Sequence, residues 1–390
     1  MIKKNKKINM FKVKCGLLIV LILIIILVTI KSKNVNKELS ILFNNEIIET
    51  LNKVIIDEEK NIYFSKEDIQ KLFDDTIYFN EAEKELITTY NTHVALLKID
   101  EEYGLIDDIN TELKGKMQEK DKKVYIPITD LQTIYDIELN YIENNNRIVI
   151  DSLLKEKKVA DVNKKTKVYE KKGFFHGNKL DNLIIRDKVV VLGEEGKYKK
   201  IRTHLGEIGY VKKNKLSEDI IIREDAKYEK QEINVYDNYS NISGIYNNIS
   251  VDSSKLNVVT PTFFNIDKNS NVLDRTSIST ATYSVYKNWT DSNGIQIMPA
   301  LENDENISKV LLSYSQRSQV IGQLRDMLLK YNYIGINIKF NTIDDINSFY
   351  RFILELYPRF KAVGIKVAVT LNSNLDRKRI ENSVDYILED

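Results

Sequence analysis

The stretch Tyr333-Ile-Gly-Ile-Asn-Ile-Lys-Phe-Asn-Thr342 decides the fold that this sequence predicts. Side chains of a β-strand alternate between two faces, and the apolar residues of this stretch therefore share one face. The polar residues Asn337, Lys339 and Asn341 share the other face. A polar row inside an apolar run indicates either the solvent side of an edge strand or the lining of a site inside a barrel.

The same stretch resembles the signature strand of glycoside hydrolase family 18, which contains chitinase-like enzymes and spore-cortex peptidoglycan hydrolases. That signature reads Asp-Gly-Ile-Asn/Asp-Ile-Asp-Phe/Trp-Glu. The matching residues are Gly335, Ile336, Asn337, Ile338 and Phe340. The resemblance implies an α/β barrel that binds or cleaves an N-acetylated glycan.

The three acidic residues of the signature are missing from this chain. Ile334 stands at the first Asp, Lys339 at the last Asp and Asn341 at the Glu. The resemblance implies that this Glu is the general acid and that the neighbouring Asp orients the acetamido group of the substrate. A general acid needs a transferable proton, which the carboxamide of Asn341 lacks, and Lys339 is a cation where the family has an anion. We therefore expect a hydrolase fold with no catalytic residue at these positions.

Strands alternate with helices through the segment 233–390, the pattern of a parallel α/β layout. Residues 233–236 and 256–264 resemble the first family 18 strands, and further strands are predicted at 294–301, 365–371 and 384–388. Helices are predicted at 279–291, 315–329 and 346–360, and the second has Val320, Leu324, Met327 and Leu328 on one face. A full eight-unit barrel takes about 250 residues, so we expect an incomplete TIM-type barrel with an open edge that a second chain could pair with.

Two smaller domains are predicted before the barrel, joined to it by a linker over residues 217–232. Residues 45–152 resemble the copper-amine-oxidase N-terminal-like stalk domain, with a strand-to-helix unit capped by Ser65 and another started by Pro127. Strands are predicted to follow at 137–142 and 147–150. Residues 158–216 contain short strands at 166–169, 188–192, 197–203 and 207–211, and resemble a bacterial SH3-like domain. The predicted class is thus multidomain: an α+β stalk, a small all-β barrel and a partial α/β barrel.

The amino end predicts a membrane anchor. Lysines flank the apolar run 16–30, no acidic residue precedes Glu38, and no small-residue cleavage site follows. Residues 1–33 are therefore predicted as a cytoplasmic tail and signal-anchor helix, and 34–44 as a tether. The expected location is the cell membrane, with a single pass and most of the chain outside the cytoplasm.

Composition excludes several kinds of partner and cofactor. Lys and Arg total 58 against 57 Asp and Glu, which does not favour nucleic-acid binding. The three His lie far apart and Cys15 is the only cysteine, so we expect no metal site, no cofactor and no disulfide within the chain.

Three functions remain open at this stage. The first is a cell-wall protein that binds peptidoglycan or a chitin-like glycan through a degenerate family 18 domain, with Phe263, Phe264, Trp289 and Tyr333 as candidate sugar-binding residues or as plain core aromatics. The second is an active N-acetylglucosaminidase or cortex-lytic hydrolase in which a displaced acid acts, the candidates being Glu302, Asp304, Asp344 and Asp345. The third is a decayed product whose terminal domain is not stable.

Overall fold

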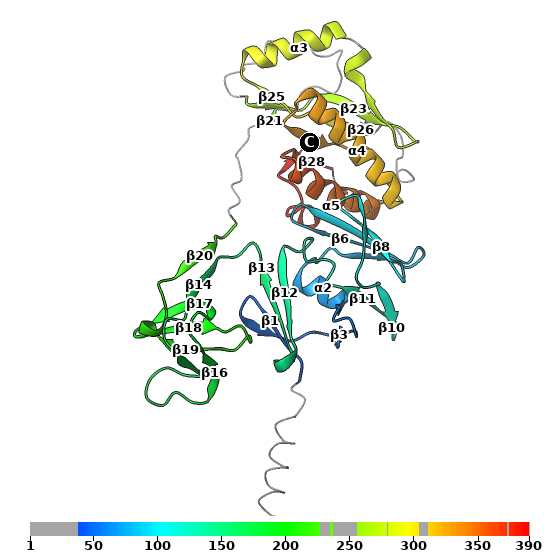
Figure 1. The fold of residues 1–390 in the computed structure, drawn as a ribbon. Coiled ribbons are helices and arrows are strands. Elements are labelled where there is room, and N and C mark those ends of the chain that lie inside the picture. Colours follow the sequence, from blue (N-terminus) through cyan, green and yellow to red (C-terminus); the bar gives the residue numbers. More distant parts are fainter. Residues whose placement is uncertain are drawn as a thin grey trace, which may run out of the picture. The chain divides into compact units, whose positions relative to one another are not determined.

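The computed structural model describes residues 38–226, 235–236, 256–278, 280–303, 311–372 and 374–389. These residues are mostly β-strands with few helices (Figure 1). The chain falls into two compact units, one made of residues 1–49 and 138–224 and the other of residues 50–137 and 225–390. The domain boundaries given above remain a prediction.

The predicted membrane location is corrected by the structure. Within the part of the chain that is described, no helix combines the length and the apolar character needed to cross a bilayer. The predicted anchor, residues 16–30, lies outside the described residues.

The first unit contains a four-stranded sheet in the order β12-β13-β1-β2. Its strands are β1 (Ser40–Phe43), β2 (Glu46–Ile48), β12 (Ile137–Ile142) and β13 (Arg147–Ser152). Strand β1 runs parallel to β13, which joins the amino end of the described chain to a segment about 100 residues later. The predicted strands at 137–142 and 147–150 are confirmed.

The same unit holds an antiparallel seven-stranded sheet in the order β16-β15-β19-β18-β17-β14-β20. The strands are β14 (Lys157–Asp161), β15 (Thr166–Tyr169), β16 (Lys179–Leu183), β17 (Lys188–Glu195), β18 (Tyr198–Arg202), β19 (Ile208–Lys212) and β20 (Ile220–Arg223). Its core contains Val168, Leu183, Ile201 and Val211. All four strands predicted in this segment are confirmed, whereas the SH3-like assignment remains a prediction.

The second unit begins with a small sheet in the order β10-β11-β4-β3. It consists of β3 (Ile55–Ile56), β4 (Ile62–Ser65), β10 (Gln118–Lys120) and β11 (Lys123–Pro127), and helix α2 (Lys66–Leu72) follows β4. The predicted cap is confirmed, because the Ser65 side chain accepts a hydrogen bond from the Asp68 backbone N–H.

The helix predicted after Pro127 is wrong. Pro127 pairs with Tyr63 as the last residue of β11, and the Ile128 N–H then donates to the Ile62 carbonyl. Residues 128–136 form turns in place of a helix. Pairing with β4 thus uses the backbone groups that would have started the helix, so tertiary pairing overrides the local signal.

A five-stranded antiparallel meander follows in chain order and pairs only neighbouring strands. Its strands are β5 (Tyr78–Asn80), β6 (Glu85–Tyr90), β7 (His93–Lys98), β8 (Tyr103–Ile106) and β9 (Ile109–Glu112). Strands β6 and β7 contact helix α5 (Ile346–Ala362) (Figure 1). Ile87, Val94 and Leu96 of the meander form a buried cluster with Tyr314.

The carboxyl-terminal part of this unit has barrel topology. One parallel sheet contains β21 (Val235–Tyr236), β22 (Val258–Val259) and β25 (Gln296–Ile297). A second parallel sheet contains β23 (Thr262–Ile266), β26 (Ala300–Asn303), β27 (Gly335–Ile338), β28 (Lys366–Leu371) and β29 (Tyr386–Glu389). Strand β24 (Val272–Asp274) adds an antiparallel edge. Parallel strands that follow one another in chain order are typical of an α/β barrel, whereas a doubly wound sheet reverses its order.

Helices cover one face of this sheet (Figure 1). They are α3 (Thr280–Ser292), α4 (Tyr314–Tyr331) and α5, which confirms the three predicted helices. In α4 the predicted apolar face is confirmed, because Val320, Leu324 and Leu328 are buried and Met327 packs against the same core. Ser313 and Gln316 form a capping box at the start of α4, and Asp345 caps α5.

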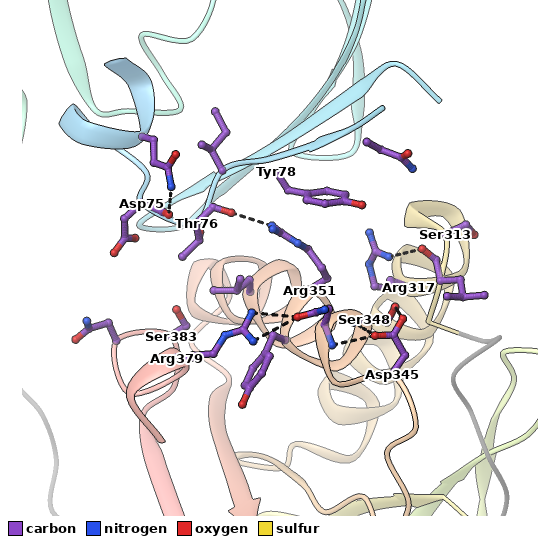
Figure 2. Close-up of a pocket in the computed structure, with 18 of the residues that line it drawn as sticks. Asp75, Thr76, Tyr78, Ser313, Arg317, Asp345, Ser348, Arg351, Arg379 and Ser383 are labelled. Carbon is purple, nitrogen blue, oxygen red and sulfur yellow. Dashed lines mark hydrogen bonds between the residues drawn. The ribbon is translucent and has the colours of Figure 1, made fainter. Parts of the chain in front are cut away.

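The meander and the barrel helices are joined by arginines on α5. Arg351 donates from Nη1 to the Thr76 carbonyl at 2.8 Å (Figure 2). Arg359 makes a two-bond ion pair with Asp108, with Nε–Oδ2 at 2.9 Å and Nη2–Oδ1 at 2.7 Å. Its Nη2 also donates to the Tyr314 hydroxyl.

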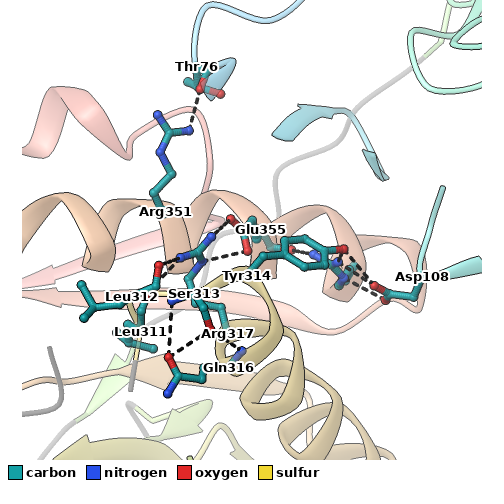
Figure 3. A network of polar contacts seen from close by, with 11 residues as sticks. Thr76, Asp108, Leu311, Leu312, Ser313, Tyr314, Gln316, Arg317, Arg351 and Glu355 are labelled. Carbon is teal, nitrogen blue, oxygen red and sulfur yellow. Dashed lines mark hydrogen bonds and ion pairs between the residues drawn. The ribbon is translucent and has the colours of Figure 1, made fainter. Parts of the chain in front are cut away.

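A second ion pair lies near this contact and joins the two helices (Figure 3). Arg317 of α4 donates from Nε and Nη2 to the carboxylate of Glu355 on α5, at 2.9 and 2.7 Å. Its Nη1 donates to the carbonyls of Leu311 and Leu312. Both charged side chains are almost fully buried, at 4% and 1% exposure, so each depends on the other for compensation.

The buried pair predicts a large stability effect. Glu355→Gln should lower the free energy of unfolding by about 3–5 kcal/mol, because it leaves the buried Arg317 guanidinium without its anion. The control is Asp291→Asn, which removes the exposed Lys287–Asp291 pair and should cost no more than about 0.5 kcal/mol. Chemical denaturation measures both values. Equal losses in the two variants would contradict the role given to the buried pair.

The ion pair between Asp108 and Arg359 predicts that the stability of the fold falls at low pH. Its hydrogen bond from Arg359 holds the pKa of the Asp108 carboxyl below the ordinary 3.8. Its stabilising effect is therefore complete above that ordinary pKa and is lost as pH falls through the lower pKa of the folded state. Asp108→Asn should be less stable than the parent chain at pH 7, and the difference should shrink below about pH 4. Denaturation at a series of pH values tests this, and a constant difference would contradict it.

Candidate functional site

The inner face of the barrel sheet is the face opposite α3, α4 and α5. Ile336, Ile338, Val367 and Val369 lie on the helix side, in the main core. Alternation therefore places their neighbours on the inner face, where Val258, Met298 and Ala368 form an apolar cluster. The inner face becomes polar toward the carboxyl ends of the strands, and its polar residues there are Thr262, Asn265, Glu302, Asn337 and Thr370.

Two of these polar residues, Asn265 and Asn337, lack part of the hydrogen bonds that their buried groups need. The Thr262 hydroxyl donates to Glu302 Oε1 at 2.9 Å, and the Thr370 hydroxyl donates to Asn337 Oδ1 at 3.0 Å. Asn265 and Asn337 are 1% and 0% exposed, and neither amide nitrogen has a hydrogen-bond partner among the described residues.

Thr260 adds a third atom of this kind. It lies between β22 and β23, is fully buried, and its Oγ1 has no partner within the described part of the chain. Buried polar atoms without partners are rare in native proteins, and each costs about 1–3 kcal/mol. Three of them near the carboxyl ends of parallel strands mark the place where barrel enzymes hold their ligands.

The signature stretch forms the centre of this face. Strand β27 covers only residues 335–338, and the N–H of Lys339 extends its pairing by donating to the Leu301 carbonyl. A Cβ on Gly335 would lie 2.4 Å from the carbonyl oxygen of Lys366 on β28. The close approach of these two strands therefore requires glycine at position 335. Ile334 packs against the apolar cluster of the inner face.

Position 341, which the signature resemblance aligns with a general acid, is held in place by Asn303 at the end of β26. Asn303 Oδ1 accepts a hydrogen bond from the Asn341 backbone N–H at 2.8 Å, and its Nδ2 donates to the Thr342 carbonyl at 2.7 Å. Asn341 is exposed just beyond β27. The backbone at position 341 is thus fixed, and the side chain that stands there is a neutral amide.

The predicted sugar-binding aromatics lie on the helix side. Phe263 and Phe264 are fully buried and Tyr333 is 7% exposed, all three within the main core, and Trp289 packs against that core. Tyr333 donates from its hydroxyl to Tyr283, and burial raises its pKa. The two Phe rings have no open face on which a sugar could stack, so the burial favours the core-aromatic alternative for them.

The candidate displaced acids are in different environments. Asp345 accepts hydrogen bonds from the Ser348 hydroxyl and from two backbone N–H groups, and the Ser348 bond lowers its pKa. It therefore acts as a helix cap that stays ionised. Asp344 is exposed, and Asp304 lies outside the described residues. Of the three candidate acids that the structure describes, Glu302 alone lies on the inner face, beside Thr262.

Sequence reasoning missed most of the inner polar set, namely Thr260, Thr262, Asn265 and Thr370. The available signal was a polar residue at alternate positions of apolar strands, as in Thr260-Pro-Thr-Phe-Phe-Asn265. The irregular pairing between Thr262 and Phe264 interrupts this alternation of polar and apolar residues, because it places two consecutive Phe residues on the helix side.

Comparison with known proteins gives a partial likeness to chitinases. A class V chitinase from Pseudomonas fluorescens Pf-5 is 16% identical over 40% of this chain and 52% of that chain, with a TM-score of 0.36. A chitinase from Chromobacterium violaceum ATCC 12472 is 20% identical over 40% and 54%, with a TM-score of 0.34. The Bacillus cereus spore cortex-lytic enzyme SleL is 14% identical over 55% and 57%, with a TM-score of 0.34.

The chain thus spans about half of the length of the solved chitinases that it matches. No family model matches the chain, and no curated protein matches it.

The buried amide of Asn337 predicts a non-additive stability effect. Thr370→Val removes the donor to Asn337 Oδ1 and should cost about 1–3 kcal/mol, because the whole amide is then buried without partners. The double variant Asn337→Leu/Thr370→Val removes both partners and should be close to the parent chain or more stable. Denaturant titration measures this, and a double variant less stable than Thr370→Val would contradict it.

Proposed function

We propose that this chain is a cell-wall protein that binds an N-acetylated glycan, of the peptidoglycan or chitin type, on the inner face of its barrel without cleaving it. One observation carries the proposal: three buried polar atoms, on Thr260, Asn265 and Asn337, have no partner among the described residues and lie near the carboxyl ends of the strands. The signature resemblance supplies the class of ligand.

The chemistry of these atoms suits a sugar. Amide N–H groups donate and hydroxyls both donate and accept, so the set matches the hydroxyl and acetamido oxygens of an N-acetylhexosamine. A ligand that supplied the missing partners would recover the cost of burying these groups. Recognition would then rest on hydrogen bonds from the sheet, because the two Phe candidates are buried in the core.

The absence of cleavage follows from proton chemistry at the signature positions. The Asn341 carboxamide has no proton to give to a glycosidic oxygen, and Lys339 cannot accept the acetamido N–H. Asp345, which caps α5, is ionised and so cannot serve as a proton donor.

A second candidate function rests on Glu302. Its carboxylate is 9% exposed on the inner face, the kind of environment in which a general acid could act. In this alternative the chain is a family 18-type hydrolase with a displaced acid, and Glu302→Gln should abolish cleavage. The third possibility, a terminal domain with no stable fold, is disfavoured by the continuous core of the second unit.

The other segments fit a wall-directed protein. We propose that residues 158–216 form a bacterial SH3-like wall-contact module and that residues 45–152 form a stalk of the copper-amine-oxidase N-terminal-like kind, with no copper. These assignments rest on their sequence resemblance. Strands in both segments agree in position with those expected.

The test is sedimentation of the full chain with purified peptidoglycan and with chitin, while reducing-sugar release is followed in the same tubes. We expect binding without release. Asn337→Ala should weaken binding roughly threefold to tenfold, because one uncharged hydrogen bond contributes about 1 kcal/mol. The matched control is Asn374→Ala, which changes an exposed amide after β28.

Each other outcome has a distinct meaning. Release that Glu302→Gln abolishes would establish the second candidate in place of the first. Equal weakening by Asn374→Ala and Asn337→Ala would remove the inner face as the site. Failure of the folded chain to bind either polymer would contradict glycan binding altogether.

A further inference from the structure

A separate cavity of about 980 Å³ lies within the second unit, between the β5–β6 region of the meander and the outer side of the barrel helices (Figure 2). Its volume falls within the range of about 300–1,000 Å³ that is usual for small-ligand sites. The lining is rich in hydroxyl, amide and charged groups, and its cations are Arg317, Arg351, Lys378 and Arg379. The polar inner face is not part of it.

Arg351 reaches this cavity from α5. Its guanidinium lies 4.0 Å from the centre of the Tyr78 ring and donates one hydrogen bond, to the Thr76 carbonyl. No carboxylate among the described residues forms an ion pair with it. Burial lowers the pKa of Arg351, yet a guanidinium stays protonated at neutral pH. The cation is therefore held in place by an aromatic ring and a carbonyl, and a guanidinium has further N–H donors to offer a ligand.

Arg379 repeats this arrangement on another wall of the cavity. Its guanidinium lies 3.8 Å from the centre of the Tyr350 ring, and it donates to Asn347 Oδ1 at 3.3 and 3.4 Å. Within the described part of the chain it has no ion pair either. By contrast, the charge of Arg317 is already compensated by Glu355. Two of the arginines are thus fixed by stacking and have no paired carboxylate in the described ranges.

Among the described residues, the acids that line the cavity form no ion pair with Arg351 or Arg379, and Glu355 and Asp74 act on Arg351 from outside the lining. The Asp345 carboxylate accepts hydrogen bonds from backbone N–H groups at the amino end of α5, and Asp75 and Glu83 are exposed to solvent. Solvated acids at this rim would repel a highly charged phosphate polymer, whereas they would tolerate a ligand of moderate charge. Planar guanidinium groups bind carboxylates with two parallel hydrogen bonds, and the surrounding amides and hydroxyls suit peptide bonds.

We propose that this cavity binds a short acidic peptide, with Arg351 and Arg379 holding its carboxylates. The inference does not rest on the glycan site, because none of the residues that define the inner face lines this cavity. It assigns the junction between meander and barrel a binding role in addition to its structural one.

The test is calorimetric titration of the full chain with the peptide acetyl-Glu-Ala-Glu, which has three carboxylates, and with the amidated analogue acetyl-Gln-Ala-Gln-amide. We expect the acidic peptide to bind and the analogue to bind at least tenfold more weakly, because a hydrogen bond to a charged group contributes more than an uncharged one. Arg379→Gln should lower the affinity for the acidic peptide about tenfold or more. Arg379→Lys should bind the acidic peptide more tightly than Arg379→Gln but less tightly than the parent chain. Lysine keeps the positive charge but lacks the planar pair of N–H donors that binds a carboxylate.

Two further variants keep the test decisive. Arg351→Gln should also weaken binding, but it removes the bond to Thr76 and so changes the junction itself. Arg379→Gln leaves that bond intact and is therefore the variant on which the proposal depends. The matched control is Arg325→Gln on α4, outside the cavity lining, which should leave affinity unchanged.

The outcomes separate this proposal from its alternatives. Equal binding of the amidated peptide, or an unchanged affinity in Arg379→Gln, would overturn it. Binding of inorganic phosphate in place of the peptide would also overturn it and would point to a phosphate ligand. Failure of glycan sedimentation with intact peptide binding would leave this inference standing and reject only the proposed function.

Discussion

The buried ion pair between Arg317 and Glu355 is the constraint on which the second unit depends. It fixes α4 against α5 at the point where α5 contacts the meander. Arg359, one turn after Glu355 on α5, then pairs with Asp108 of the meander and donates to Tyr314 of α4. Because each guanidinium uses several donors in a fixed geometry, the pairs set orientation as well as proximity.

This arrangement has a consequence for the surface around it. The two arginines that complete the junction differ from Arg317 and Arg359 in having no carboxylate partner among the described residues. Arg351 and Arg379 are instead stacked on Tyr78 and Tyr350. Stacking holds a cation in place without pairing it with a carboxylate, so both guanidinium groups keep N–H donors that a ligand could use.

Regular elements with strong local signals could be predicted from the sequence. The three barrel helices lie where the sequence predicts them, and so do the short strands 166–169 and 207–211, which turns separate. The prediction of a helix after Pro127 is wrong, because the pairing of Pro127 with Tyr63 is a tertiary effect that no local pattern contains. The meander of residues 78–112 was missed, although its strands pair in simple chain order.

The candidate site was harder to predict, because it depends on register between strands far apart in the sequence. Thr262 meets Glu302 and Thr370 meets Asn337 only once β23, β26, β27 and β28 are aligned. A single strand shows which residues share a face, as β27 did for Asn337. It does not show which polar atoms remain without partners after the sheet has formed.

The matching residues of the signature can be separated by what the fold itself requires. Gly335 is needed because a side chain would collide with the Lys366 carbonyl, and Ile336, Ile338 and Phe340 are needed by the core under α5. Packing explains these four without any ligand. Asn337 is different: it is fully buried, an apolar residue would suit the sheet better, and its amide nitrogen has no partner among the described residues. A residue that the fold does not need, at the centre of the inner face, is the strongest argument for the ligand site proposed on this face.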